Sequence, residues 1–348
     1  MKNNIPIIVL TPVKNESWIL EKFLTATSVF ADIIIIADQN STDGSVEIAK
    51  KFDKVVLIKI SDDEYNEDFR QKLLILKARE LVPGKKILIA LDADELFAGD
   101  SLNSPDWEIV ATSSLGTTFT CERIDLLNPV NRCLRAYKFF KFAFIDDGKP
   151  HNGTPVNSPR LPFDPDGKIV NLSHIKIIHF ARVREEIYFD KRRFYTMMEN
   201  ISGLIPLKSR IGEYSKRVQI CTEKWRSEVS HSEWIDVWQN EHGLNLTYFK
   251  QVANSQFKIK CIQLFQKYGE HRFYLDDIWD INWNNVIENN IDNSQIHKSF
   301  KVKGPVLYHK ILTLLLVNLW KLRRANRTID FISFRLMENL RRIMRPGI

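Results

Sequence analysis

A short apolar run that ends abruptly in acidic residues is the feature that most constrains this chain. Residues 87–91 (Ile-Leu-Ile-Ala-Leu) are followed directly by Asp92, Asp94 and Glu95. Such a run predicts a short strand that is buried on both faces of a parallel sheet. Ligands of open α/β sheets bind just beyond the carboxyl ends of the strands. These acidic residues are therefore predicted to lie at a binding edge.

Asp92 and Asp94 can act together on one cation. Carboxylates at alternate positions of an extended segment lie on the same side of it. Oxygen ligands of this kind suit Mg²⁺ or Mn²⁺, either of which would keep coordination sites free for substrate phosphates. The alternative is a polar loop that caps the following helix, and an Asp-x-Asp pair by itself does not decide between the two.

Strands and helices alternate over the first ninety residues. Apolar runs predict strands at 5–11, 33–37, 55–60 and 87–91, and amphipathic segments predict helices at 16–30, 43–52 and 67–81. This alternation is typical of a parallel sheet with right-handed crossovers. We therefore predict the α/β class, with a Rossmann-like, mostly parallel sheet flanked by helices and a helical C-terminal region.

The pattern changes along the rest of the chain. From about residue 114 to 178, strand-like runs alternate with loops rich in Pro, Gly and Asn, and the sequence becomes mostly helical from Val183. We predict a first domain at 1–203, a helical extension at 204–303 and basic amphipathic helices at 304–348.

The charge is distributed unevenly. Residues 298–348 hold twelve Lys and Arg against Asp330 and Glu338, a net charge of +10, whereas the other residues together carry −3. We therefore expect no nucleic-acid partner for the body, and a tail that meets something anionic. The four cysteines lie far apart, as reduced buried thiols do, and a predicted strand follows Met1-Lys-Asn-Asn directly. A cytoplasmic location is expected.

Two more polar segments follow predicted strands. Thr11-Pro-Val-Lys-Asn-Glu16 comes after the first strand, and Asp38-Gln-Asn-Ser-Thr-Asp-Gly-Ser45 comes after the second. Each leads into a predicted helix, and helix N-termini favour phosphate. Asn15 and Ser41 taken singly are explained as turn and cap residues. Three polar segments at one sheet edge nevertheless indicate a shared binding site.

These three segments together resemble glycosyltransferase family 2, of the GT-A fold. The resemblance rests on residues 12–16, 37–45 and 91–95, in this order and spacing, and covers about the first third of the chain. Looser matches to a bacterial branch of the family follow at 144–148, 151–152, 160–162, 179–180 and 191–195.

The resemblance implies a nucleotide-sugar site within about residues 1–100 and an acceptor side at about 114–203. The donor-binding residues that it implies are Thr11, Pro12, Val13, Asn15, Glu16, Asp38, Gln39, Asn40, Ser41, Asp92 and Ala93. Asp92 and Asp94 would hold Mn²⁺ or Mg²⁺ against the diphosphate, where the cation stabilises the charge of the leaving group. The resemblance favours a UDP-sugar, although family members commonly have Asp in place of Gln39 and an aromatic residue in place of Lys14.

His179 is a further candidate metal ligand. It follows the apolar run 175–178 and so lies at a strand end. In GT-A enzymes a residue in such a place often completes the metal shell. A single histidine there is equally explained as a structural residue whose hydrogen bonds are satisfied.

An inverting transferase needs a carboxylate that takes the proton from the acceptor hydroxyl. Asp146 and Asp147 follow the apolar segment 139–145 and open a long loop, which makes them the candidate catalytic pair. Asp-Asp-Gly is also good turn sequence. Glu122 and Asp125 are the alternatives for the base.

The basic tail contains two apolar helical patterns. Residues 306–322 are strongly apolar, but their uninterrupted core is shorter than the ~20 residues that span a bilayer. A second pattern recurs at helical spacing beside arginines, at Ile329, Ile332, Leu336, Leu340 and Ile343. We expect an interfacial anchor on an anionic membrane surface. The alternative is a helical hairpin that packs on the body or on another subunit.

We therefore predict a metal-dependent, inverting glycosyltransferase, peripheral at the inner face of the cell membrane. It would transfer a sugar from a nucleotide donor to a glycan or lipid-linked acceptor, in the synthesis of a bacterial surface polysaccharide or another glycan. One alternative is a sugar-nucleotide nucleotidyltransferase, whose Gly-rich, basic phosphate loop residues 11–16 do not supply. The other is a membrane-associated nucleotide-sugar-binding module without catalysis.

Overall fold

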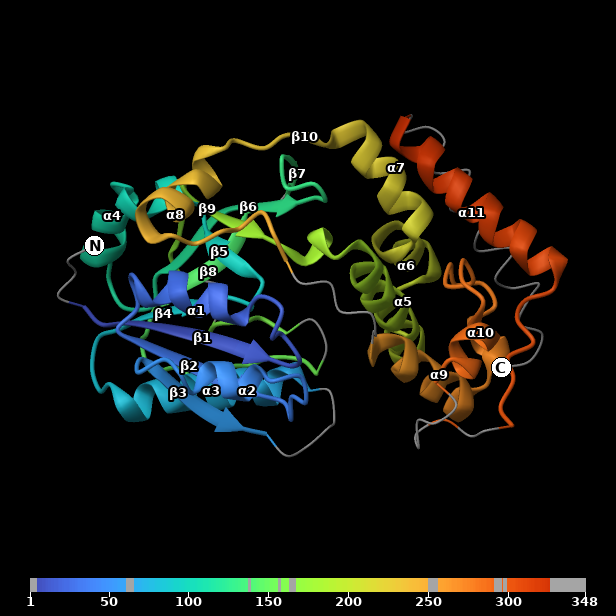
Figure 1. The fold of residues 1–348 in the computed structure, drawn as a ribbon, viewed down its shortest axis with the longest axis horizontal. Helices are drawn as coiled ribbons and strands as arrows, with labels where there is room; N and C mark the ends of the chain where they lie inside the picture. The colour runs from blue at the N-terminus through green and yellow to red at the C-terminus, as the bar shows by residue number, and fades with distance from the viewer. Residues whose placement is uncertain are drawn as a thin grey trace. The chain divides into compact units, whose positions relative to one another are not determined.

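The chain forms two compact units (Figure 1). The computed structural model describes residues 5–60, 66–136, 139–155, 158–162, 167–249, 256–290, 296 and 299–325. Residues 322–325 are described by their backbone alone. The first unit holds the described residues 5–184 and 228–249, and the second holds those from 185 to 227 and from 256 to 325.

A mixed sheet forms the centre of the first unit (Figure 1). One half is parallel, in the order β4-β1-β2-β3, and consists of β1 (Ile7–Val13), β2 (Ile33–Asp38), β3 (Val55–Lys59) and β4 (Ile87–Ala90). The other half is mostly antiparallel and consists of β5 (Glu95–Phe97), β6 (Thr118–Leu126), β7 (Arg132–Arg135), β8 (Phe140–Ile145), β9 (Ile169–His179) and β10 (Glu228–Val229). The predicted α/β class is confirmed.

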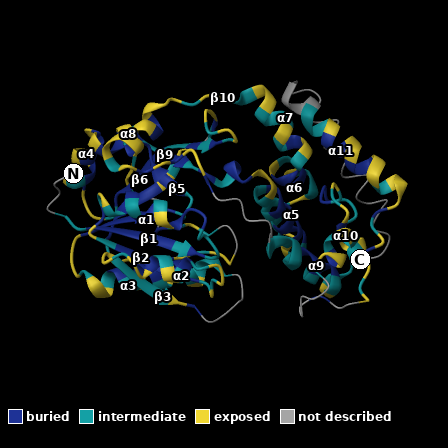
Figure 2. Ribbon diagram, in the orientation of Figure 1, coloured by how far each residue is buried: buried dark blue, intermediate teal, exposed yellow. Residues whose placement is uncertain are grey.

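Side chains of the parallel strands alternate between two cores. Val9 faces the core covered by α1 (Leu20–Ser28), and Ile8 faces the core covered by α3 (Glu67–Leu81). Successive strand side chains point to opposite faces, so strands covered on both faces need continuous apolar sequence. Figure 2 shows β1 and β2 mostly buried and the edge strand β3 half-buried.

Shorter helices complete the first unit. They are α2 (Ser45–Ala49), α4 (Asp106–Thr112) and α8 (Glu233–His242), with the 3-10 turns η1 (Gly99–Asn103) and η2 (Ala181–Val183). Both α2 and α4 contribute buried side chains to the core on the α1 side of the sheet.

Residues 228–249 return to the first unit after a helical excursion. β10 pairs with β7, and Trp238 of α8 is fully buried. The indole Nε1 of Trp238 donates to the Phe97 carbonyl oxygen at 2.9 Å. The first unit therefore breaks at residue 184 and regains a later segment, unlike the predicted domain that runs unbroken to 203. Helical periodicity identifies the apolar face of α8 but not the body against which it packs.

The second unit is built from helices, as predicted for the chain from Val183 onward. They are α5 (Glu185–Ser202), α6 (Leu207–Tyr214), α7 (Lys216–Arg226), α9 (Gln256–Tyr268), α10 (Trp283–Glu288) and α11 (Leu307–Ala325), with the 3-10 turn η3 (Glu270–Phe273). α5 packs against α6 and α9, and α11 packs against α6 and α7. No helix within the described residues combines the length and apolarity needed to cross a membrane.

Candidate active site at the carboxyl edge of the sheet

The polar loops after β1 and β2 are tied together by hydrogen bonds. The Asn15 backbone N–H donates to Ser41 Oγ at 2.9 Å, and Asn15 Oδ1 accepts from the Thr42 N–H at 2.8 Å. The Asp38 carboxylate accepts from the Ser41 N–H at 3.2 Å. Asn15 and Asn40 have φ angles of 57° and 55°, a left-handed region that asparagine tolerates better than most residues. The two loops form one fixed, polar edge.

Other predicted donor residues differ in what their side chains can reach. Gln39 Oε1 accepts from Arg70 Nη1 at 2.7 Å, and Lys14 Nζ donates to the backbone carbonyl oxygens of Gln39 and Asn40. The side chain of Lys14 therefore stabilises the loop after β2 by hydrogen bonds to its backbone. Thr11, Val13 and Ala93 are almost completely buried, so their side chains belong to the interior and not to the exposed part of this edge.

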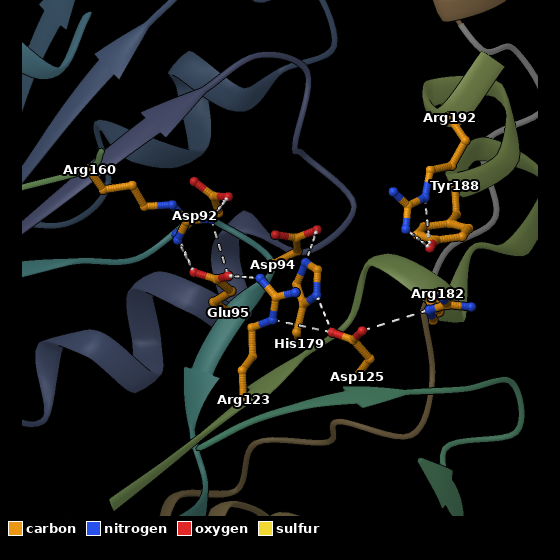
Figure 3. Close-up of polar contacts among 10 residues, drawn as sticks. All are labelled: Asp92, Asp94, Glu95, Arg123, Asp125, Arg160, His179, Arg182, Tyr188 and Arg192. Carbon is orange, nitrogen blue, oxygen red and sulfur yellow. Dashed lines mark hydrogen bonds and ion pairs between the residues drawn. The ribbon is translucent and has the colours of Figure 1, made fainter. Parts of the chain in front are cut away.

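Two strand pairings place His179 beside carboxylates from distant parts of the sequence. β5 pairs with β9 so that Glu95 lies opposite His179, and β6 pairs with β9 so that Asp125 also lies opposite His179. His179 Nε2 lies 3.5 Å from Asp94 Oδ2, and His179 Nδ1 lies 2.7 Å from Asp125 Oδ1 (Figure 3). The imidazole thus lies between two carboxylates.

The electrostatics of this group follow from its geometry. Burial favours the neutral imidazole, but Asp94 and Asp125 together raise the pKa of His179 to about 9. Burial likewise opposes the charged form of Asp125, yet the hydrogen bond from His179 lowers the pKa of Asp125 well below its usual range. Metal-binding histidines commonly make a hydrogen bond to a carboxylate through their second ring nitrogen, as Nδ1 does here to Asp125. Nε2 of His179 is then directed at Asp94.

Arg160 pairs with the acidic residues on either side of Asp94 in the sequence. Its guanidinium bridges Asp92 and Glu95, with Nη1 2.5 Å from Glu95 Oε2 (Figure 3). Glu95 has no exposed surface, and Arg123 Nη1 lies 3.7 Å from Glu95 Oε1. Burial would raise the pKa of Glu95, but Arg160 lowers it below its usual value.

Asp94 and His179 fit part of a divalent metal site. Within the described residues, no three His, Cys, Asp or Glu side chains are gathered as a complete ligand set. The predicted triad is partly assembled, because Asp92 pairs with Arg160 instead. Neighbouring ligands of an octahedral Mg²⁺ lie ~3 Å apart, and the ion is usually held by one or two protein carboxylates together with substrate phosphates. Asp94 and His179 therefore fit a divalent cation whose remaining coordination sites are filled by a phosphate ligand.

Asp146 and Asp147 lie at the opposite edge of the sheet, which contradicts their assignment as the catalytic pair. β8 runs antiparallel to β4, so the end of β8 lies beside the first residue of β4. Six residues of extended chain, from Lys86 to Asp92, correspond to ~20 Å. The apolar segment 139–145 identifies a strand but not its direction.

Buried ion pairs account for Asp146 instead. Arg79 Nη2 and Lys86 Nζ each lie 2.8 Å from its carboxylate. Of the two alternatives for the base, Glu122 pairs with Arg135 at 2.8 Å and Asp125 holds His179. Asp125 therefore orients a neighbouring side chain, and Glu122 belongs to a surface ion pair.

Comparison with known proteins finds fold-level likeness only. No family model and no curated protein sequence matches the chain. Similar solved structures include HddC from Yersinia pseudotuberculosis (13% identity, 53% of this chain and 96% of that one, TM-score 0.32). GalNAc-T7 with UDP, GalNAc and Mn²⁺ is 12% identical over 71% of this chain and 59% of that one, with TM-score 0.37.

A third similar structure is glucosyl-3-phosphoglycerate synthase from Mycobacterium tuberculosis, in complex with Mn²⁺, UDP and glucosyl-3-phosphoglycerate. It is 13% identical over 49% of this chain and 71% of that one, with TM-score 0.28. Likeness at this level says nothing of the substrate, metal or acceptor of this chain. The resemblance to glycosyltransferase family 2 stays a prediction.

Asp146→Asn tests whether this carboxylate stabilises the fold. We expect its free energy of unfolding to fall by about 3–5 kcal/mol, because the change leaves the buried ammonium of Lys86 without its charged partner. Chemical denaturation measures the change. Glu80→Gln is the control, since Glu80 pairs with Lys77 on the surface and should cost at most ~1 kcal/mol. A variant that unfolds like wild type but has lost activity would restore Asp146 to a catalytic role.

Proposed function

We propose that the protein is a glycosyltransferase that uses a nucleotide-sugar donor. The proposal is supported by one observation above all. Asp94, His179 and Asp125 meet at the same sheet edge as the joined loops after β1 and β2. The loops offer a fixed polar surface to a nucleotide, and Asp94 with His179 offers two ligands to Mn²⁺ or Mg²⁺. Such a cation, when bound, stabilises the negative charge of a departing nucleoside diphosphate.

Each part of the edge has a role in this proposal. Asn15, Asp38 and Ser41 shape the nucleotide site, Gln39 lies where the base would be recognised, and a UDP-sugar is the donor that we favour. Asp125 fixes the orientation of His179. The acceptor is a glycan or lipid-linked hydroxyl, and transfer proceeds with inversion in the synthesis of a bacterial surface glycan.

Donor binding with and without Asp94 tests this function. UDP-, GDP-, CMP- and dTDP-linked sugars are screened with Mn²⁺ by thermal shift. A ligand at a hundred times its dissociation constant adds ~2.7 kcal/mol of stability, which is readily detected. We expect one class to stabilise the wild type, UDP-sugars foremost. Asp94→Asn should lose the metal-dependent part of that binding in calorimetric titration, because a ligand of the cation is gone.

Asp236→Asn is the matched control, since Asp236 is exposed on α8. It should bind donor like wild type. Undiminished metal-dependent binding by Asp94→Asn would remove the metal from this site. A wild type that neither binds nor turns over any of the four donor classes would contradict the function itself.

We further propose that α11 attaches the enzyme to the inner face of the cell membrane from the cytoplasm. One face of α11 packs Leu316 and Val317 with Ile211 and Val218 of the second unit. Its other face exposes apolar side chains by 46–73%, namely Leu307, Tyr308, Ile311, Leu314 and Leu315.

Charge supports an anionic partner for this face. Lys310 is exposed among the apolar residues, and the chain from 298 onward has a net charge of +10. Apolar side chains beside basic ones suit an anionic bilayer surface. The helical repeat predicted at 329–343 lies outside the described residues.

Flotation with liposomes tests the attachment. Replacing Leu307, Ile311 and Leu315 by Gln should lower binding to anionic liposomes at least tenfold, because each buried aliphatic side chain contributes about 1.5–3 kcal/mol. Binding of the wild type should also fall with added salt. Substitutions are preferable to deleting 305–348, which would uncover Ile211 and Val218.

The matched control replaces three exposed apolar residues of the first unit by Gln: Leu76, Ile109 and Leu115. This variant should bind anionic liposomes to the same extent as the wild type. A wild type that ignores anionic liposomes, or a triple α11 variant that still binds them fully, would show that α11 is not a membrane surface.

A further inference from the structure

Arg184 is a buried cation for which the described residues supply neither a hydrogen bond nor an ion pair within 4 Å. It follows η2 and is 9% exposed, and its Nε atom is buried without a hydrogen-bond partner. Burying an unpaired charge is costly, and desolvation accordingly lowers the pKa of Arg184. A charge kept in such a place needs a compensating partner.

An indole holds the guanidinium in position. The Arg184 guanidinium carbon lies 4.5 Å from the centre of the Trp18 ring. Trp18 is itself fixed, because its Nε1 donates to Glu16 Oε2 at 2.6 Å and its ring meets Phe249 edge-on at 5.5 Å between centroids. A guanidinium stacked on an aromatic face keeps its N–H groups at its rim, where they can bind an anion bidentately.

The charges around Arg184 come from all three segments of the candidate site. Three carboxylates attract its charge and so raise the pKa of Arg184, against the effect of burial. Glu16 belongs to the loop after β1, Asp94 to the proposed metal-binding pair, and Asp43 to the loop after β2. Each already has another partner. Trp18 donates to Glu16, His179 lies beside Asp94, and the backbone N–H groups of Ser17 and Ser45 donate to Asp43. Arg184 is thus a cation at the junction of these segments.

We propose that Arg184 binds the diphosphate of the donor. This inference rests on the proposed function and adds a residue that the sequence motifs do not identify. The guanidinium contacts the phosphoryl oxygens directly and neutralises part of their charge. Asp94 and His179 hold the cation. Because the contact is to phosphate, it favours a nucleoside diphosphate over the corresponding nucleoside.

Calorimetric titration of the full chain with Mn²⁺ tests the inference. UDP, GDP, CDP and dTDP are compared first, and the tightest binder is carried forward with its nucleoside. Arg184→Gln should weaken diphosphate binding about 10- to 100-fold, the usual range for a hydrogen bond to a charged group. Affinity for the nucleoside should stay unchanged. Arg184→Lys keeps the positive charge but lacks the two parallel N–H donors of the guanidinium, so its affinity for the diphosphate should lie between those of the wild type and Arg184→Gln. It serves as the test if Arg184→Gln does not fold.

Arg135→Gln is the matched control. Arg135 also stacks on an indole, 5.4 Å from the centre of Trp234, but it is paired with Glu122 and Glu228. This variant should bind the diphosphate like wild type. If the wild type binds a diphosphate and both Arg184 variants bind it equally well, the inference is overturned and the proposed function stands. If the wild type binds no nucleoside diphosphate, both are overturned.

Discussion

The position of β9 between β5 and β6 is the constraint on which the candidate site depends. Through these two pairings His179 lies beside Asp94 on one side and Asp125 on the other. A slip of one residue would turn every side chain of the strand to its other face. The core opposes such a slip, because it would bring Lys176 into the place of the fully buried Ile175 or Ile177. The packing of the strand core thus sets the geometry of the proposed metal ligands.

A buried carboxylate organises the turn that carries Asp94. Glu95 Oε2 accepts from the Asp92 N–H at 3.0 Å, and Arg160 and Arg123 offset the charge of Glu95. Removing water from a carboxylate is costly unless such partners are present. The structure therefore contains two kinds of charge at this edge. The pairs of Glu95 hold the turn in place, whereas Asp94, His179 and Arg184 are the residues that we propose to contact the cation and the diphosphate.

The sequence predicts the parallel half of the sheet well and the strand pairings of the other half poorly. Strands buried on both faces require long apolar runs, so β1, β2 and β4 stand out, and the bounds predicted for α3 agree with the structure. Local patterns cannot reveal that the three-residue β5 pairs with β9, that β8 runs toward the opposite edge, or that α8 returns to the first unit. The misassignment of Asp146 and the absence of Arg184 from the predicted site follow from these non-local contacts. So does the role of Asp125, which the sequence offers only as an alternative base and which the strand pairing places against His179.

In the mechanism that we propose, Asp94 and His179 together bind the cation that accompanies a nucleoside diphosphate. Pulsed electron paramagnetic resonance of Mn²⁺ bound to the full chain with UDP, or with whichever nucleoside diphosphate binds tightest, tests it most directly. We expect magnetic coupling between the manganese and one imidazole nitrogen, which disappears in His179→Gln although the protein remains folded. Mn²⁺ that is bound together with the nucleotide but shows no nitrogen coupling in the wild type would mean that His179 is not a ligand of the cation.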